Sequence, residues 1–309
     1  MKSKVSLVKS ESKTVEGIKE DFSNSLNLID YKLPSSVKTA VLKVNLCFYW
    51  NASTGYTTDP LLVEAIIDYI REKCGNNVDI KIAEADASAM KTKHAFQLLG
   101  YNKLAKQKNV QLLNLTEDTI KETEIQVANR KMSLQVPQSL LTSDLFINVP
   151  KLKVMRRVFI TCAMKNLFGA IAFPRKVTYH PLLEETIVAI NKVLKPNLNI
   201  VDAKVALGRT PIRLNLLTAS ESAFSSDWVS AQIAGYNPSK IKFLKLAKQE
   251  KLGDSKDVVP VGEPIGPFKA IFPTENHFVT SLKAKMQVTM IKAYSAVSGD
   301  VIPTSLDDM

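Results

Sequence analysis

The apolar segment Leu145–Val149 limits the folds open to this chain more than any other feature. Two of its residues, Ile147 and Val149, are β-branched, which is typical of a parallel strand covered on both faces. Pro150 lacks a backbone donor and favours an extended conformation in the residue before it, so regular pairing should stop there. The segment therefore predicts an α/β fold.

Alternating strands and helices on both sides of this segment support that prediction. Further strands are expected at Val5–Val8, Val37–Leu46, Val78–Ala85, Val110–Leu115, Leu198–Asp202 and Ile212–Thr218. Helices are expected at Val15–Leu28, Leu61–Cys74, about Lys91–Lys108, Val158–Ile171, Pro181–Leu194 and Lys240–Lys251. This order predicts a mostly parallel sheet with helices on both faces.

Two regions depart from the alternation. Glu124–Val136 contains two alternating runs around Asn129-Arg130, which predicts a small hairpin insertion. From Asn237 the pattern loosens, and Asp257–Pro273 is rich in proline and glycine. We therefore expect an α/β domain over residues 1–236 and a C-terminal extension, residues 237–309, packed on it.

Lysine and asparagine side chains gather where the predicted strands end, the edge at which open α/β sheets bind ligands. They are Lys43, Asn45, Asn148, Lys151, Lys153, Lys165 and Asn166, with Arg175 as a further candidate. Two like charges about 6 Å apart repel by roughly 3 kcal/mol at an effective dielectric near 20. Two interpretations stay open: the lysines point to solvent or pair with Glu84, Asp86 and Asp202, or they bind an anionic ligand.

The polar loop before the helix at Leu61 offers further donors. Thr57 and Thr58 could bind an anion at the helix N-terminus, although Asp59 as N-cap would occupy the same donors. The chain has no Walker loop and no G-x-G-x-x-G, so nucleotide binding is not supported. His180, in a loop entering a helix, is the candidate for proton transfer, with a structural role as the alternative.

Two motifs, INVPKLK (Ile147–Lys153) and MKNLFG (Met164–Gly169), resemble the signature of the family called domain of unknown function 362. Further matching segments are Lys43-Val44-Asn45-Leu46, Thr57-Thr58-Asp59-Pro60 with Glu64, Leu99-Gly100-Tyr101 and Ile200-Val201-Asp202, so the resemblance runs from about Val41 to Pro238. It implies an α/β fold with a ligand site at the lysines, and it favours the ligand interpretation over the solvated one. It also implies roles for Arg175 and His180, because the family often carries an arginine and a histidine there.

The chain departs from the family pattern at two places. Met155 stands where members usually carry a histidine, and an acidic segment is reduced to Ser222–Asp227, which keeps only its second aspartate. Some members also carry a ferredoxin-like module, for which this chain has no cysteine run. The resemblance therefore implies a fold and a site and leaves the reaction open.

Composition excludes several classes of protein. The three cysteines, Cys47, Cys74 and Cys162, are scattered, which argues for a reducing cytoplasm and against both a disulfide framework and an iron–sulfur cluster. No His/Cys/acid spacing predicts a zinc site, so we expect no metal; magnesium at Glu84, Asp86 and Asp202 is the alternative. No apolar run approaches the roughly 18 residues of a membrane span, and the first residues lack the apolar run of a signal peptide.

The net charge of +11, from 41 basic and 30 acidic residues, points to acidic partners. The leading hypothesis is a ligand-binding protein or enzyme that holds a small carboxylated or phosphorylated molecule. In the enzyme, Lys165 would stabilise developing negative charge while His180 or a carboxylate moves a proton. The alternatives are weak, non-specific nucleic-acid binding and docking of a separate iron–sulfur protein. The sequence specifies neither a cofactor nor an oligomeric state.

Overall fold

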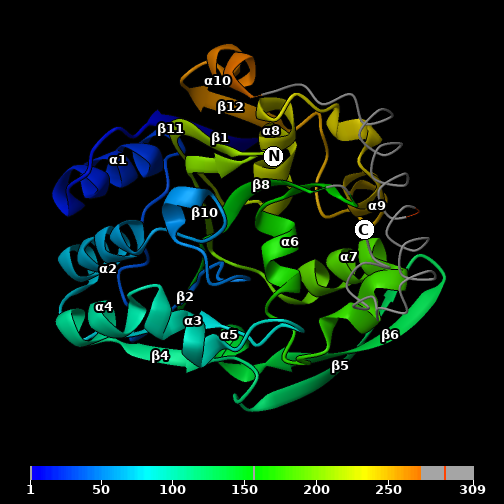
Figure 1. Ribbon diagram of the computed structural model, residues 1–309, viewed down its shortest axis with the longest axis horizontal. Coiled ribbons are helices and arrows are strands. Elements are labelled where there is room, and N and C mark those ends of the chain that lie inside the picture. Colours follow the sequence, from blue (N-terminus) through cyan, green and yellow to red (C-terminus); the bar gives the residue numbers. More distant parts are fainter. Residues whose placement is uncertain (1, 156, 273–288, 290–309) are drawn as a thin grey trace. The chain divides into compact units, whose positions relative to one another are not determined.

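A computed structural model describes residues 2–155, 157–272 and 289, and its centre is a twisted sheet (Figure 1). In spatial order the main strands are β12 (Val258–Gly262), β1 (Ser3–Lys9), β11 (Pro211–Ser220), β10 (Leu198–Leu207), β7 (Leu145–Asn148), β2 (Thr39–Lys43), β3 (Asp79–Glu84) and β4 (Gln111–Asn114). Neighbours from β10 to β4 are parallel, as are β1 and β12, whereas β11 runs antiparallel to both β10 and β1. The predicted mostly parallel α/β sheet is confirmed.

Helices cover both faces of this sheet (Figure 1). One layer contains α1 (Val15–Leu28), α2 (Pro60–Cys74), α3 (Thr92–Leu98) and α4 (Tyr101–Lys108). The other contains α6 (Ala163–Phe168), α7 (Leu183–Val193), α8 (Ala223–Ile233) and α9 (Lys242–Gln249). Successive strand residues alternate between the two cores, since Leu145 and Ile147 pack in the first and Phe146 in the second. An apolar run without polar alternation is what such a strand requires.

The start of α2 follows the predicted capping pattern. The Asp59 side chain accepts the Leu61 backbone N–H at 3.0 Å, and Pro60 occupies the first helical position. The single helix expected at Lys91–Lys108 is wrong, because Gly100 adopts a left-handed conformation with φ of 84° and divides it into α3 and α4. A left-handed residue cannot continue an α-helix.

The long helix expected at Val158–Ile171 is also wrong. After Pro150 the chain resumes an extended course as β8 (Lys151–Met155), which pairs with β10, and then forms β9 (Phe159–Thr161), which pairs with β8. Phe159 has a positive φ of 65°, which is incompatible with a helix. Only the short α6 remains, and its first backbone N–H, of Ala163, donates to the buried Asp227 carboxylate at 2.6 Å.

The predicted hairpin insertion is confirmed as β5 (Ile120–Val127) and β6 (Arg130–Pro137), followed by the short α5 (Gln138–Thr142). Near the C-terminus, β12 adds an edge strand to the main sheet and α10 (Ile265–Ile271) follows it. Residues 1–272 thus form one compact unit that includes the first part of the expected extension. The rest of that extension, Thr289 apart, lies outside the described residues. Within the described part of the chain, no helix has the length and apolar character needed to span a membrane.

Candidate functional site

Two of the predicted site lysines form buried ion pairs at the ends of the parallel strands. Lys43 ends β2, and its Nζ lies 2.7 Å from Oε1 of Glu84, the last residue of the adjacent β3. On β8, Lys151 Nζ lies 2.9 Å from Asp202 Oδ2 on β10. No more than 4% of any of these four side chains is exposed. For these two lysines, pairing with strand-end carboxylates is the interpretation that holds.

The surroundings of the Lys43–Glu84 pair satisfy both charges. Glu84 also accepts the backbone N–H groups of Leu46 at 2.8 Å and Ala85 at 2.9 Å. Lys43 donates to the Val44 carbonyl at 2.9 Å and to Asn166 Oδ1 at 3.1 Å. A buried pair needs such additional hydrogen bonds to offset its desolvation. Lys43 therefore contributes mainly to the scaffold of the site.

The predicted asparagines form a hydrogen-bonded chain behind the lysines. Asn166 on α6 accepts from Asn45 Nδ2 and donates to Asn148 Oδ1 on β7, both at 2.8 Å. Asn148 in turn donates to Asn199 Oδ1 on β10 at 2.8 Å. Because these amides bind one another, they fix the positions of α6, β7 and β10 relative to the lysines.

Lys153 is buried without a carboxylate partner. Its side chain is 2% exposed, and its Nζ donates to Asn45 Oδ1 at 2.7 Å and to the Tyr56 carbonyl at 3.0 Å. Its third contact is Cys47 Sγ, also at 3.0 Å. Among the described residues, no Asp or Glu oxygen lies within 4.0 Å of this ammonium group, so its charge is solvated only by neutral groups.

Lys176, which the sequence did not single out, is a second such lysine. It begins a 3₁₀ segment (Lys176–Leu182), is 6% exposed, and donates to the backbone carbonyl of Asp86. The Asp86 carboxylate itself pairs with Lys91 at 2.8 Å. Burial lowers the pKa of Lys176 to about 8; the negative charge of Glu84 opposes this effect and the positive charge of Lys43 reinforces it.

Lys165 is the third, and its amine has the fewest partners. In the described part of the chain, Nζ makes no hydrogen bond or ion pair and lies 3.7 Å from the centre of the Phe168 ring. The residue is half-buried. Desolvation lowers the pKa of Lys165 to about 7, and negative charge on the Cys47 sulfur would act in the opposite direction. The like charges that lower this pKa further are those of Lys153, Lys176 and Lys43.

The remaining predicted residues lie in different settings. Thr57 Oγ1 donates to the Trp50 carbonyl at 2.7 Å, and Thr58 Oγ1 donates to the Val149 carbonyl at 2.9 Å, so both hydroxyls hold the loop in place. Arg175 is exposed, and its neighbour Lys176 is the residue that reaches the other lysines. The backbone carbonyl of His180 accepts a hydrogen bond from Arg157.

Two members of this group, Lys176 and Cys47, were not predicted from the sequence. Cys47 directly follows the predicted strand end at Leu46, and that position is a usable signal, which cysteine spacing alone does not reveal. Lys176 carried no such signal. It stands beside Arg175 in a loop, and the sequence does not show which of two adjacent cations turns inward.

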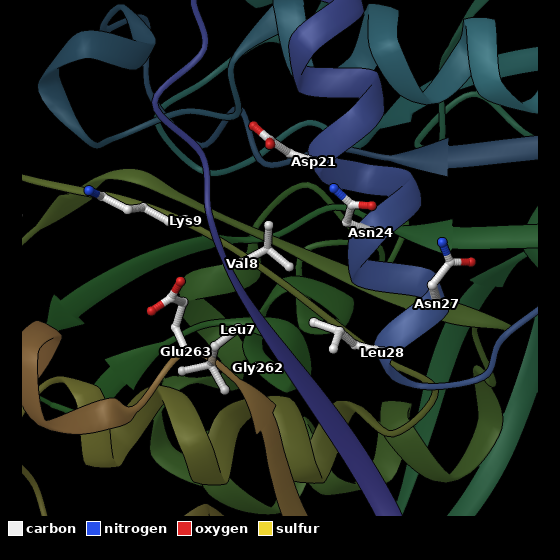
Figure 2. A pocket seen from close by; sticks show the side chains of 9 residues that line it. All are labelled: Leu7, Val8, Lys9, Asp21, Asn24, Asn27, Leu28, Gly262 and Glu263. Carbon is white, nitrogen blue, oxygen red and sulfur yellow. The ribbon is translucent and has the colours of Figure 1, made fainter.

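Two cavities in the described part of the molecule lie away from the lysines. One, of about 610 Å³, is lined by residues of β1 and α1 and by Gly262 and Glu263 (Figure 2). Figure 2 shows Asp21, Asn24 and Asn27 on its α1 side. The other, of about 300 Å³, is lined by residues that include Asn191, Lys195 and Ser222. Neither is lined by Lys153, Lys165 or Lys176.

A metal would find few free ligands at the strand ends. In residues 2–155, 157–272 and 289, no three His, Cys, Asp or Glu side chains lie close enough together to hold an ion. Glu84, Asp86 and Asp202, the hypothetical magnesium ligands, each bind a lysine.

Comparison with known proteins identifies the family. The model of the family described as "Domain of unknown function (DUF362)" matches residues 40–232, which is more than half of the chain, and the chain belongs to this family. The chain is 30% identical over 133 residues to the thylakoid-associated protein sll1697 of Synechocystis sp.. That match covers 39% of this chain and 41% of the cyanobacterial protein.

Among solved structures, the chain is similar to the lactate racemase apoprotein from Thermoanaerobacterium thermosaccharolyticum. The sequence identity is 13% and the TM-score is 0.46, with 79% of this chain and 56% of that chain covered. In both comparisons the chain spans less than two thirds of the length of the similar protein.

Proposed function

We propose that this member of the domain of unknown function family binds a small anionic molecule, carboxylated or phosphorylated, at Lys153, Lys165 and Lys176. We call these three residues the lysine cluster. The observation that carries the proposal is that all three lack a carboxylate partner in the described structure, whereas Lys43 and Lys151 beside them have one. The scaffold lysines are thus neutralised by carboxylates, and the lysine cluster is not.

The energetic argument favours an anion over an empty cluster. Like charges about 6 Å apart repel by roughly 3 kcal/mol at an effective dielectric near 20, so three cations held together by the fold are costly. Desolvation is the main cause of the lowered pKa of Lys165, and the like charges of Lys153 and Lys176 lower that pKa further. A carboxylate or phosphate among them would supply the missing charge and several strong hydrogen-bond acceptors.

Burial of the cluster favours a small ligand over nucleic acid. Lys153 and Lys176 are 2% and 6% exposed, so a phosphate on a polymer backbone would have little access to them. Exposed lysines elsewhere would account for weak, salt-sensitive nucleic-acid binding. The reduced thiol of Cys47 within the site agrees with a protein of the reducing cytoplasm.

In an enzyme built on this site, Lys165 fits a proton-transfer role. A group with a pKa of about 7 exists in both protonation states near neutral pH, which is the condition for efficient acid–base catalysis. Lys153 and Lys176 would orient the substrate and stabilise negative charge that develops on it. His180 remains a second proposed proton carrier.

Native mass spectrometry of the purified protein tests the proposal by searching for a bound anion. Isothermal titration with phosphate, pyrophosphate and citrate then measures affinity for Lys176→Met and for Lys245→Met, a matched change at an exposed lysine of α9. We expect the first variant to weaken binding at least tenfold and the second to leave it unchanged. Because the bound anion stabilises the charged lysines, affinity should also fall as the pH rises from about 7 to 9. Equal affinities in the two variants would refute the assignment.

A further inference from the structure

Within the lysine cluster, the three amines have different surroundings. Lys153 Nζ donates to two oxygens, and Lys176 Nζ donates to the Asp86 carbonyl. Lys165 Nζ makes no hydrogen bond or ion pair in the described structure and lies over the face of the Phe168 ring. Hydrogen bonds to protein oxygens hold the amines of Lys153 and Lys176 in place, whereas Lys165 is bound by no such contact.

We propose that Lys165 is a nucleophile that forms an imine with the carbonyl carbon of the ligand. The site would then take small aldehydes or ketones that also carry a carboxylate or a phosphate. This inference rests on the proposed function, because Lys153 and Lys176 hold the anionic group and so bring the carbonyl carbon to Lys165 Nζ. All three lysines then contribute to binding the anion, and Lys165 alone takes part in covalent chemistry.

The chemistry balances with the groups at hand. The neutral amine attacks the carbonyl carbon, a C–N bond forms, and the carbonyl oxygen takes up a proton. The carbon–oxygen bond then breaks, and the oxygen leaves as water with the two protons that the amine carried. No oxidant, reductant or further reactant is needed.

The surroundings of Lys165 favour this step over a purely structural role. Attack requires the neutral amine, and a lysine with an ordinary pKa is neutral in well under one molecule in a thousand at pH 7. Desolvation and the neighbouring cations hold the pKa of Lys165 at about 7, so a large fraction is neutral there. Burial and adjacent positive charge activate lysines for imine formation in general. A lysine that served only to pack on Phe168 would not need the other cations around it.

Reductive trapping tests the inference on the wild-type protein. Pyruvate and dihydroxyacetone phosphate are the probes, and acetone is the neutral control that carries no anionic group. After treatment with sodium borohydride, a trapped imine adds the mass of the probe less one oxygen atom, and peptide mapping locates it. We expect modification at Lys165 at least tenfold above that at Lys245, with acetone giving no such preference. Lys165→Arg, which keeps the positive charge, should abolish the preferred modification.

The outcomes separate this inference from the proposed function through phosphate titration of the same samples. Phosphate binding with selective trapping at Lys165 supports both. Phosphate binding with no trapping, or with trapping spread evenly over exposed lysines, overturns the imine and leaves anion binding in place. Absence of both binding and trapping overturns both. Because the trapping site is mapped in the wild-type chain, poor folding of Lys165→Arg would not affect the result.

Discussion

Replacing Lys165 by methionine tests whether this lysine serves ligand binding or the stability of the fold. Lys165→Met keeps the aliphatic length of the side chain and removes its charge. In the structure this charge has no carboxylate partner among the described residues, and three other lysines lower its pKa. We therefore expect the variant to be as stable as the wild type or more stable, and to lose affinity for phosphate.

The magnitude follows from the charging of the lysine. A pKa that falls from 10.5 to about 7 corresponds to a penalty of about 5 kcal/mol for the charged form. Because the residue keeps partial exposure, solvent relaxation reduces this to about 1–3 kcal/mol. The lost contact with Phe168 subtracts about 0.5–1 kcal/mol. At about 2 °C per kcal/mol for a chain of this size, the melting temperature should rise by up to roughly 5 °C.

The pH dependence gives this prediction a definite sign. Between the folded pKa of about 7 and the unfolded value of 10.5, the unfolded chain binds more protons at Lys165 than the folded chain does. The wild type therefore gains stability as the pH rises through this window, and the advantage of Lys165→Met shrinks. Thermal melts of both proteins at about pH 6.5 and pH 9.5 measure the change. A variant that unfolds more easily at both values, with normal phosphate binding in its folded fraction, would show that Lys165 is structural.

Three further changes test the scaffold. Glu84→Gln leaves the buried Lys43 charge uncompensated, so urea denaturation should show a loss of about 3–5 kcal/mol, largely recovered when Lys43→Met is added. Gly169→Ala places a Cβ 3.1 Å from Lys43 Nζ, so the free energy of unfolding should fall by about 1–3 kcal/mol. Gly266→Ala is the control, because the space around its Cβ is open, and it should not destabilise the protein. Equal effects would contradict the packing argument. Burial raises the pKa of Asp227 to about 7, so its folded carboxyl binds a proton that the unfolded one releases above 3.8. The stability of the wild type should therefore fall as the pH rises from 3.8 to about 7. Thermal melts of Asp227→Asn over the same pH range should show a flatter decline.

The position of the site could be predicted because it depends on local patterns and on one topological rule. The segments Val37–Leu46 and Leu145–Val149 predict strands, and parallel strands bring their carboxyl ends to one edge. The register pairs Lys43 with Asn148, so the strand-end residues meet as expected. Where the prediction failed, the cause was a distant contact. The short α6 begins at Ala163 because Asp227, far along the chain, accepts its backbone N–H, and helical periodicity contains no information about that carboxylate.

The charge state of the site could not be predicted, because it depends on which lysine finds which acid. Glu84 and Asp202 were candidate partners for several lysines, and only the three-dimensional register assigns them to Lys43 and Lys151. The third acid, Asp86, turns its carboxylate to Lys91 and offers only a backbone carbonyl to the site.

The division of the lysines into paired and unpaired groups favours a ligand at the strand ends. A strand-end cluster in which every lysine had a carboxylate would be a stable salt-bridge network that needs no ligand. A cluster in which no lysine had a carboxylate partner would destabilise the folded state too strongly. The observed division lies between these limits. The pairs at Lys43 and Lys151 hold the strands in place, whereas Lys153, Lys165 and Lys176 have no carboxylate partner among the described residues. Buried cations that a protein leaves uncompensated are more readily explained by a ligand than by stability, since hydrophobic residues of similar size would stabilise the fold better.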